Sequence, residues 1–142
     1  PGFFEEVFYR AFLFGFLFRF AGWGFLPAAL IGAVIFGAGH LYQSTDPAEA
    51  AGIFAITAIG ALWFAWLYVE WDYNLWVPVS IHLLMNFWWE FFDVADTALG
   101  PASASAARLA VILISIVLTV VVARGKGGRT ITGRVWLRGT GS

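Results

Sequence analysis

The chain has 142 residues, of which 61% are apolar and 12% are charged, and its formal net charge is −1. An average soluble protein is about 25% charged, and a soluble domain of this length has too little interior to bury so much apolar surface. The composition therefore excludes an ordinary soluble domain. It predicts an all-α, polytopic membrane protein with about five spanning helices. The absence of cysteine excludes disulfides and thiol chemistry.

Five apolar runs are predicted to be helices, in the order Phe3–Phe20, Pro27–Tyr42, Ala48–Tyr68, Pro78–Phe92 and Ser103–Ala123. The fourth is short for a full span, which favours a tilted or re-entrant helix. Two runs carry small residues at four-residue spacing, which lets helices approach closely. These stripes are Ala29, Ala33 and Gly37 in the second run, and Thr57, Ala61 and Ala65 in the third. Four tryptophans are expected near the membrane interfaces: Trp23, Trp66, Trp71 and Trp76.

The tail after the last apolar run is basic and rich in glycine. It holds five of the eight basic residues, namely Arg124, Lys126, Arg129, Arg134 and Arg138. Basic segments favour the cytoplasmic side, so we expect the tail there, on the same side as the loop that follows Arg19. The expected location is a bacterial inner (plasma) membrane. Residues Thr130–Trp136 also have the pattern of a small hairpin.

Three ionisable residues lie at the start of the first apolar run, where an unpaired charge costs several kcal/mol. Glu6 and Arg10 are four residues apart and therefore share a helix face, which predicts an ion pair. Glu5 is turned about 100° from Glu6 and has no local partner. An unpaired carboxylate in such a setting is a candidate general base. The plainer alternative is that both glutamates are solvated at the membrane surface.

The two histidines of the chain, His40 and His82, both lie in apolar runs. Either one alone is more often a satisfied core residue. Together with the glutamates they indicate one polar site inside the membrane. Asn86 follows His82 by one turn, so an amide and an imidazole could both donate hydrogen bonds to a developing oxyanion. Glu90 continues the same face and marks the end of the helix.

Three spacings together resemble a known family. Glu5-Glu6-x-x-x-Arg10, Phe36-x-x-x-His40 and His82-x-x-x-Asn86 resemble, in order and in helical placement, the three motifs of the CPBP intramembrane proteases. This is the family of the Rce1-type CAAX prenyl endopeptidases, also called ABI. The resemblance covers about Phe3 to Phe92. Members usually have further helices before the first motif. Because the chain starts at Pro1, without a methionine or a signal peptide, we expect either upstream helices or a fragment.

The resemblance implies a role for each motif residue. Glu5 and His40 would activate a water molecule, and His82 and Asn86 would stabilise the oxyanion. Glu6, Arg10 and Phe36 would be supporting residues. The resemblance also divides the chain into a CPBP-like core at residues 1–96, an additional transmembrane helix at 97–123 and the basic tail at 124–142.

The residues do not decide whether the site binds a metal ion. Glu5, His40 and His82 could supply a zinc-binding set, as a metalloprotease-like enzyme would need. A water activated by glutamate and histidine needs no metal, and the usual His-Glu-x-x-His signature on one helix is absent. No cofactor is therefore certain, and zinc is the one to test.

The leading functional hypothesis is an intramembrane endopeptidase that cleaves a prenylated or membrane-embedded protein or peptide. The alternative is a non-proteolytic membrane subunit or assembly factor of a larger complex. A third hypothesis, pigment or haem ligation by His40 or His82, is weaker, because the residue four positions before each histidine is the bulky Phe36 or Pro78. The expected partners are lipids and a membrane-embedded substrate, and no nucleic acid.

Overall fold

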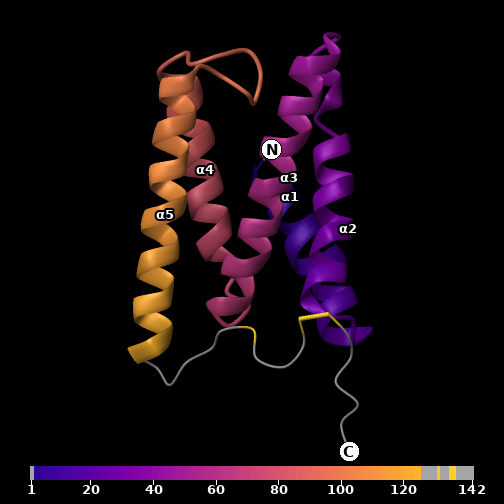
Figure 1. The fold of residues 1–142 in the computed structure, drawn as a ribbon. Helices are drawn as coiled ribbons and strands as arrows, with labels where there is room; N and C mark the ends of the chain where they lie inside the picture. Colours follow the sequence, from indigo (N-terminus) through magenta and orange to yellow (C-terminus); the bar gives the residue numbers. More distant parts are fainter. Residues whose placement is uncertain (1, 126–130, 132–134, 137–142) are drawn as a thin grey trace, which may run out of the picture.

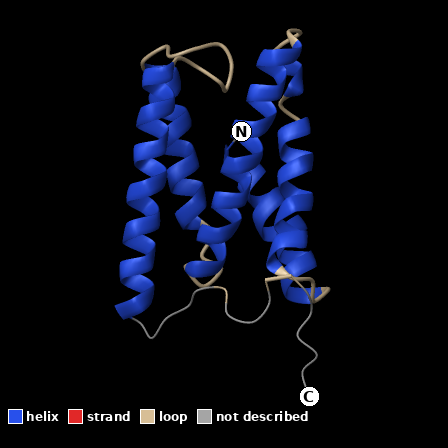
Figure 2. Cartoon of the chain, in the orientation of Figure 1, coloured by secondary structure: helices blue, strands red, loops and turns tan. Residues whose placement is uncertain are grey.

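The computed structural model describes residues 2–125, 131 and 135–136 (Figure 1). The elements are α1 (Gly2–Glu6), the π-helices η1 (Val7–Phe14) and η2 (Phe16–Phe20), α2 (Phe25–Ala38), the 3₁₀ turn η3 (Leu41–Gln43), α3 (Pro47–Glu70), α4 (Trp76–Phe91) and α5 (Ala102–Gly125). The described part of the chain contains no strand (Figure 2). The predicted all-α helix bundle is confirmed. The suggested hairpin at Thr130–Trp136 lies largely outside the described residues.

The first predicted helix forms, but its winding differs from the expected one. Most of it is π-helical, with bonds such as that from the Ala21 N–H to the Phe16 carbonyl, 2.8 Å long. Its buried side recurs every four residues, at Gly2, Glu6, Arg10, Phe14 and Phe18. Segments of π-helix are rare and frequently occur at functional sites.

A side-chain cap explains where α3 begins, whereas α2 starts without one. The Asp46 carboxylate accepts a hydrogen bond of 2.8 Å from the Glu49 N–H, so α3 starts at Pro47, within one residue of the prediction. α2 starts at Phe25, two residues before the predicted Pro27, and the Leu26 N–H of its first turn donates to the Val135 carbonyl at 2.9 Å. α2 also ends earlier than predicted, which leaves His40 in the turn before η3.

The two stripes of small residues pack against each other and bring α2 and α3 together, so the predicted close approach occurs between these two helices. Ala33 and Ala61 belong to one buried cluster with Phe36, and Ala29 and Ala65 belong to a neighbouring one. The approach is closest at Gly37, where an added Cβ would lie 2.9 Å from a ring carbon of Phe54. The absence of a side chain at Gly37 therefore lets the end of α2 lie close to Phe54 of α3.

We expect Gly37→Ala to destabilise the protein by about 1–3 kcal/mol, because the methyl group overpacks this contact. Gly60→Ala is the matched control, since a Cβ there meets nothing within 4 Å. Alanine should be neutral or slightly stabilising at Gly60. Thermal unfolding of the purified variants measures both effects. An equal unfolding temperature for the two variants would contradict the close approach.

Among the described residues, three helical segments are long and apolar enough to cross a membrane: Phe25–Gln43, Pro47–Glu70 and Ala102–Val122. The first predicted span is divided into shorter segments, and α4 has only 16 residues. In Figure 1 the connections 21–24 and 71–75 and the end of α5 lie at one end of the bundle, and loops 39–46 and 92–101 lie at the other. The chain is an integral membrane protein. The predicted interfacial position of the four tryptophans stays a prediction.

Candidate active site

Two helices bring three ionisable side chains together. α1 begins about midway between the two ends of the bundle and contacts α4 (Figure 1). The His82 Nδ1 donates a hydrogen bond of 2.7 Å to Oε1 of Glu6, which is fully buried. The His82 Nε2 lies 3.5 Å from Oε2 of Glu5. Gly2 lies against the imidazole, since an added Cβ there would be 3.4 Å from its Cγ, in van der Waals contact.

Arg10 completes the cluster. Its Nε lies 3.0 Å from Oε2 of Glu6, which confirms the predicted pair at four-residue spacing. The contact is an ion pair without good hydrogen-bond alignment, since Oε2 of Glu6 has no hydrogen-bond partner in the described chain. The guanidinium lies between the rings of Phe36 and Phe64, 5.0 and 5.1 Å from their centroids. The cluster thus joins one guanidinium and one imidazole to two carboxylates.

His40 reaches the cluster only through an aromatic ring. Its Nδ1 donates to the Phe36 carbonyl at 2.7 Å, so the four-residue spacing of this motif reflects a bond to the end of its own helix. The Phe36 ring lies 4.4 Å from the His40 ring and 6.4 Å from the His82 ring. With Nδ1 occupied as a donor, neutral His40 presents Nε2 as an acceptor.

Asn86 lies one turn beyond His82, as predicted, but its side chain is exposed and makes no hydrogen bond within the described chain. Glu90, on the same side of α4, is exposed as well. The structure therefore brings Glu5, Glu6, Arg10 and His82 into direct contact. The Phe36 ring lies beside both His40 and His82, and Asn86 is an exposed residue next to these four side chains.

Comparison with protein families identifies the chain. A family model described as type II CAAX prenyl endopeptidase Rce1-like matches residues 1–88. The chain belongs to the Rce1-like family. A search of curated proteins and a search of solved structures returned no match. In this Rce1-like chain the match includes the three motifs and ends within α4, so loop 92–101 and α5 lie outside it. The domain boundary at residue 96 stays a prediction.

The described residues of the Rce1-like chain form no group of three or more His, Cys, Asp or Glu side chains that could hold a metal ion. Both ring nitrogens of His82 face glutamates, and Nδ1 of His40 is bound to a backbone carbonyl. The zinc set that the sequence left open does not fit this arrangement of the described residues. Of the four histidine ring nitrogens, three therefore face a carboxylate or a backbone carbonyl in the described chain. The fourth, Nε2 of His40, has no such contact there.

Phe64 is the residue of this site that the sequence did not reveal. Its ring stacks on His82 with a centroid distance of 5.2 Å and also makes a cation–π contact with the guanidinium of Arg10. Trp63 stacks on Phe64 in turn, at 4.6 Å. Phe64 lies in α3 outside the three motifs, among other aromatic residues, and no spacing distinguishes it. Only the packing of α3 against η1 and α4 shows that Phe64 contacts both the histidine and the arginine.

Proposed function

We propose that this Rce1-like chain is an intramembrane endopeptidase that hydrolyses a peptide bond of a prenylated or membrane-embedded protein or peptide. The observation that carries the proposal is the buried cluster of Glu5, Glu6, Arg10 and His82. Such a cluster is expensive in a membrane, and clusters of this kind are typical of functional sites. The family match over residues 1–88 supplies the reaction class.

Glu5 is the proposed general base. Its side chain is 28% exposed, whereas that of Glu6 is fully buried, so Glu5 is the carboxylate that a water molecule can reach. Glu5 would take a proton from this water, and Nε2 of His40 would accept the second hydrogen and orient the molecule. The resulting hydroxide would attack the carbonyl carbon of the scissile peptide bond.

His82 and Asn86 would stabilise the oxyanion that forms on the carbonyl oxygen. Because Nδ1 of His82 donates to Glu6, Nε2 can donate only when the ring is protonated. The paired Glu6 and Arg10 fix the orientation of this ring. Asn86 would supply the second donor from its exposed position on α4. The oxyanion then collapses, the C–N bond breaks, and Glu5 returns its proton to the leaving amine.

Cleavage of a farnesylated C-terminal peptide by the purified protein in liposomes tests the proposal. We expect hydrolysis that follows the protein through purification and survives removal of metal by a chelator. A matched peptide without the prenyl group reports whether the lipid is recognised. If the protein hydrolyses neither the prenylated peptide nor a membrane-embedded one, the proposed function is wrong.

We also propose that the tail lies in the cytoplasm of a bacterial cell. The end of α5, after which the basic tail begins, and the 21–24 connection, which follows the η2 helix with Arg19, lie at the same end of the bundle (Figure 1). This agrees with the preference of basic residues for the cytoplasmic face. A cysteine introduced by Ser142→Cys should be labelled by a membrane-impermeant reagent only after the membrane is opened. Labelling of intact cells would reverse the topology.

A non-proteolytic subunit is the alternative function, and the aromatic surface of α4 favours it. Four exposed rings contact one another there, some stacked and some edge to face, with centroid distances of 5.1 to 5.8 Å: Phe87, Trp88, Phe91 and Phe92. A face of this kind could pack against another membrane protein. Purification with a stable stoichiometric partner that also forms with Glu5→Gln would support this alternative, whereas a lone monomer would remove it.

A further inference from the structure

Helix α5 is joined to α3 by two hydrogen bonds of the same kind. The indole Nε1–H of Trp63 donates to Oγ of Ser115 at 3.1 Å. The indole Nε1–H of Trp71, just after α3, donates to Oγ1 of Thr119 at 3.0 Å. An indole N–H can only donate, and a donor without a partner is costly inside a membrane. The two hydroxyl groups of α5 therefore fix where these indoles lie.

The Ser115 hydroxyl is turned so that its oxygen can accept the bond from Trp63. Its own O–H donates to the Ile112 carbonyl, 2.8 Å away in the same helix, which leaves the oxygen lone pairs for the indole. Ile112 and Ile116 of α5 pack against the buried cluster that includes Trp63 and Phe64. The Trp63 ring is thus held by one directed hydrogen bond and by apolar contacts from the same helix.

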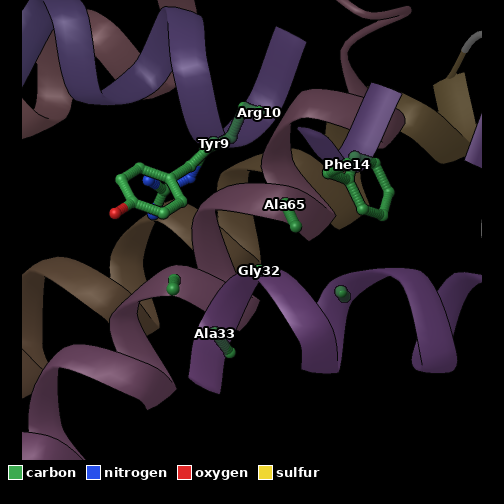
Figure 3. Close-up of a pocket in the computed structure, with 8 residues that line it drawn as sticks. Tyr9, Arg10, Phe14, Gly32, Ala33 and Ala65 are labelled. Atoms are coloured by element: carbon green, nitrogen blue, oxygen red, sulfur yellow. The ribbon is translucent and has the colours of Figure 1, made fainter. Parts of the chain in front are cut away.

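Trp63 also belongs to a stack of three buried rings that ends in the candidate active site. The planes of Trp63 and Phe64 are 23° apart, with centroids separated by 4.6 Å. The planes of Phe64 and His82 are 25° apart, with centroids separated by 5.2 Å. The small pocket between η1, α2 and α3 is lined by other residues, among them Tyr9 and Arg10 (Figure 3). Close-packed side chains transmit displacements, so a shift of the Trp63 ring is passed through Phe64 to the imidazole.

The position of the His82 ring matters because a donor to an oxyanion must lie within about 2.7–3.1 Å of it. The bond of 2.7 Å to Glu6 directs the Nδ1 edge of the ring. Hydrogen bonds tolerate a broad range of angles, so this bond does not by itself fix the tilt of the ring plane. The stacked ring of Phe64 restricts that tilt, and with it the position of Nε2.

We propose that Trp63, held by Ser115 of α5, is a positioning residue for His82. It acts through Phe64 and touches no substrate. The inference rests on the proposed function, in which Nε2 of His82 donates to the oxyanion. It also extends the working site to a helix outside the family match at residues 1–88. Trp71 provides a matched control, because it packs on the same cluster and has the same kind of bond to α5 but is not one of the three stacked rings.

Ser115→Ala and Thr119→Val each remove one hydroxyl acceptor, and comparing them tests the proposal. Both variants should lose thermal stability by similar amounts. Only Ser115→Ala should lower kcat for peptide cleavage, by roughly 3-fold to 20-fold, which is what one hydrogen bond between membrane helices can contribute. KM should stay nearly unchanged, because the oxyanion forms only as the reaction proceeds. Ser115→Thr keeps the hydroxyl and should restore kcat.

Trp63→Phe keeps a ring but lacks the indole N–H, so it should lower kcat to the same extent as Ser115→Ala. If the two residues act through their mutual bond, the double variant should be no slower than either single variant. Additive losses in kcat would show that they act separately, and the proposal would be wrong.

The NMR signals of the His82 ring provide a test that does not depend on peptidase activity. The chain has two histidines, so His40→Ala assigns the signals of both. Ser115→Ala should shift the His82 signals and leave those of His40 in place, whereas Thr119→Val should shift neither. Cross-relaxation between the Phe64 and His82 rings in the parent protein is expected even if a variant does not fold.

The proposal is overturned if Ser115→Ala leaves the His82 signals unchanged, if Thr119→Val shifts them equally, or if the cross-relaxation is absent. A parent protein that cleaves no peptide would instead contradict the proposed function, and the His82 signals would still decide whether Trp63 positions the ring.

Discussion

Replacing Glu5 with glutamine should reduce the rate of peptide cleavage by about 10²–10⁴-fold, which is the contribution of a positioned general base. Glutamine keeps the shape of the side chain but cannot take a proton from water. Since Nε2 of His82 lies only 3.5 Å from Glu5, an amide should still fit beside it. We therefore expect the loss in kcat, with KM nearly unchanged, when cleavage is measured at several peptide concentrations.

His40→Ala should lower kcat in the same assay, because it removes the acceptor Nε2 that orients the water. Glu90→Gln is the matched control for the glutamate, since Glu90 is exposed on α4 and takes no part in the proposed mechanism. Its activity should equal that of the parent protein. Full activity of Glu5→Gln or of His40→Ala would contradict the mechanism while leaving the fold intact.

Features that depend on local spacing were predictable from the sequence. The pair of Glu6 and Arg10 follows from one helical turn, and the contact of α2 with α3 follows from small residues at four-residue spacing. The predicted start and end of α3, α4 and α5 agree with the structure to within two residues. These features are local because a helix fixes the positions of residues three and four apart, whatever the rest of the chain does.

Features that depend on tertiary packing were not predictable. The bond between Glu6 and His82 joins residues 76 positions apart, and nothing in the sequence says which of the two glutamates lies nearer to the histidine. The stacking of Phe64 on His82 likewise depends on how α3 is rotated. The periodicity of α4 correctly placed Asn86 on the same helix face as His82. It could not show that His82 is buried while Asn86, one turn later, is exposed.

Removing Arg10 should be among the most destabilising single changes in this protein. Arg10→Met leaves the carboxylate of Glu6 fully buried without its cation, and breaking a buried pair in this way costs about 3–5 kcal/mol. The hydrogen bond from His82 compensates in part, so we expect a value near the lower limit. Arg10→Lys should recover only part of the loss, because an ammonium cannot lie flat between Phe36 and Phe64 as a guanidinium does.

The double variant Glu6→Gln with Arg10→Met should be more stable than Arg10→Met alone, because it removes the stranded charge as well. Chemical unfolding of the parent, both single variants and the double variant gives the coupling energy between the two residues. Arg19→Met, in the next π-helical segment η2, is the control. Arg19 is exposed and lies 4.1 Å from the centroid of the Tyr73 ring, so its loss should change stability by about 0.5 kcal/mol or less. Equal stability of Arg10→Met and Arg19→Met would show that Arg10 does not balance the buried carboxylate of Glu6.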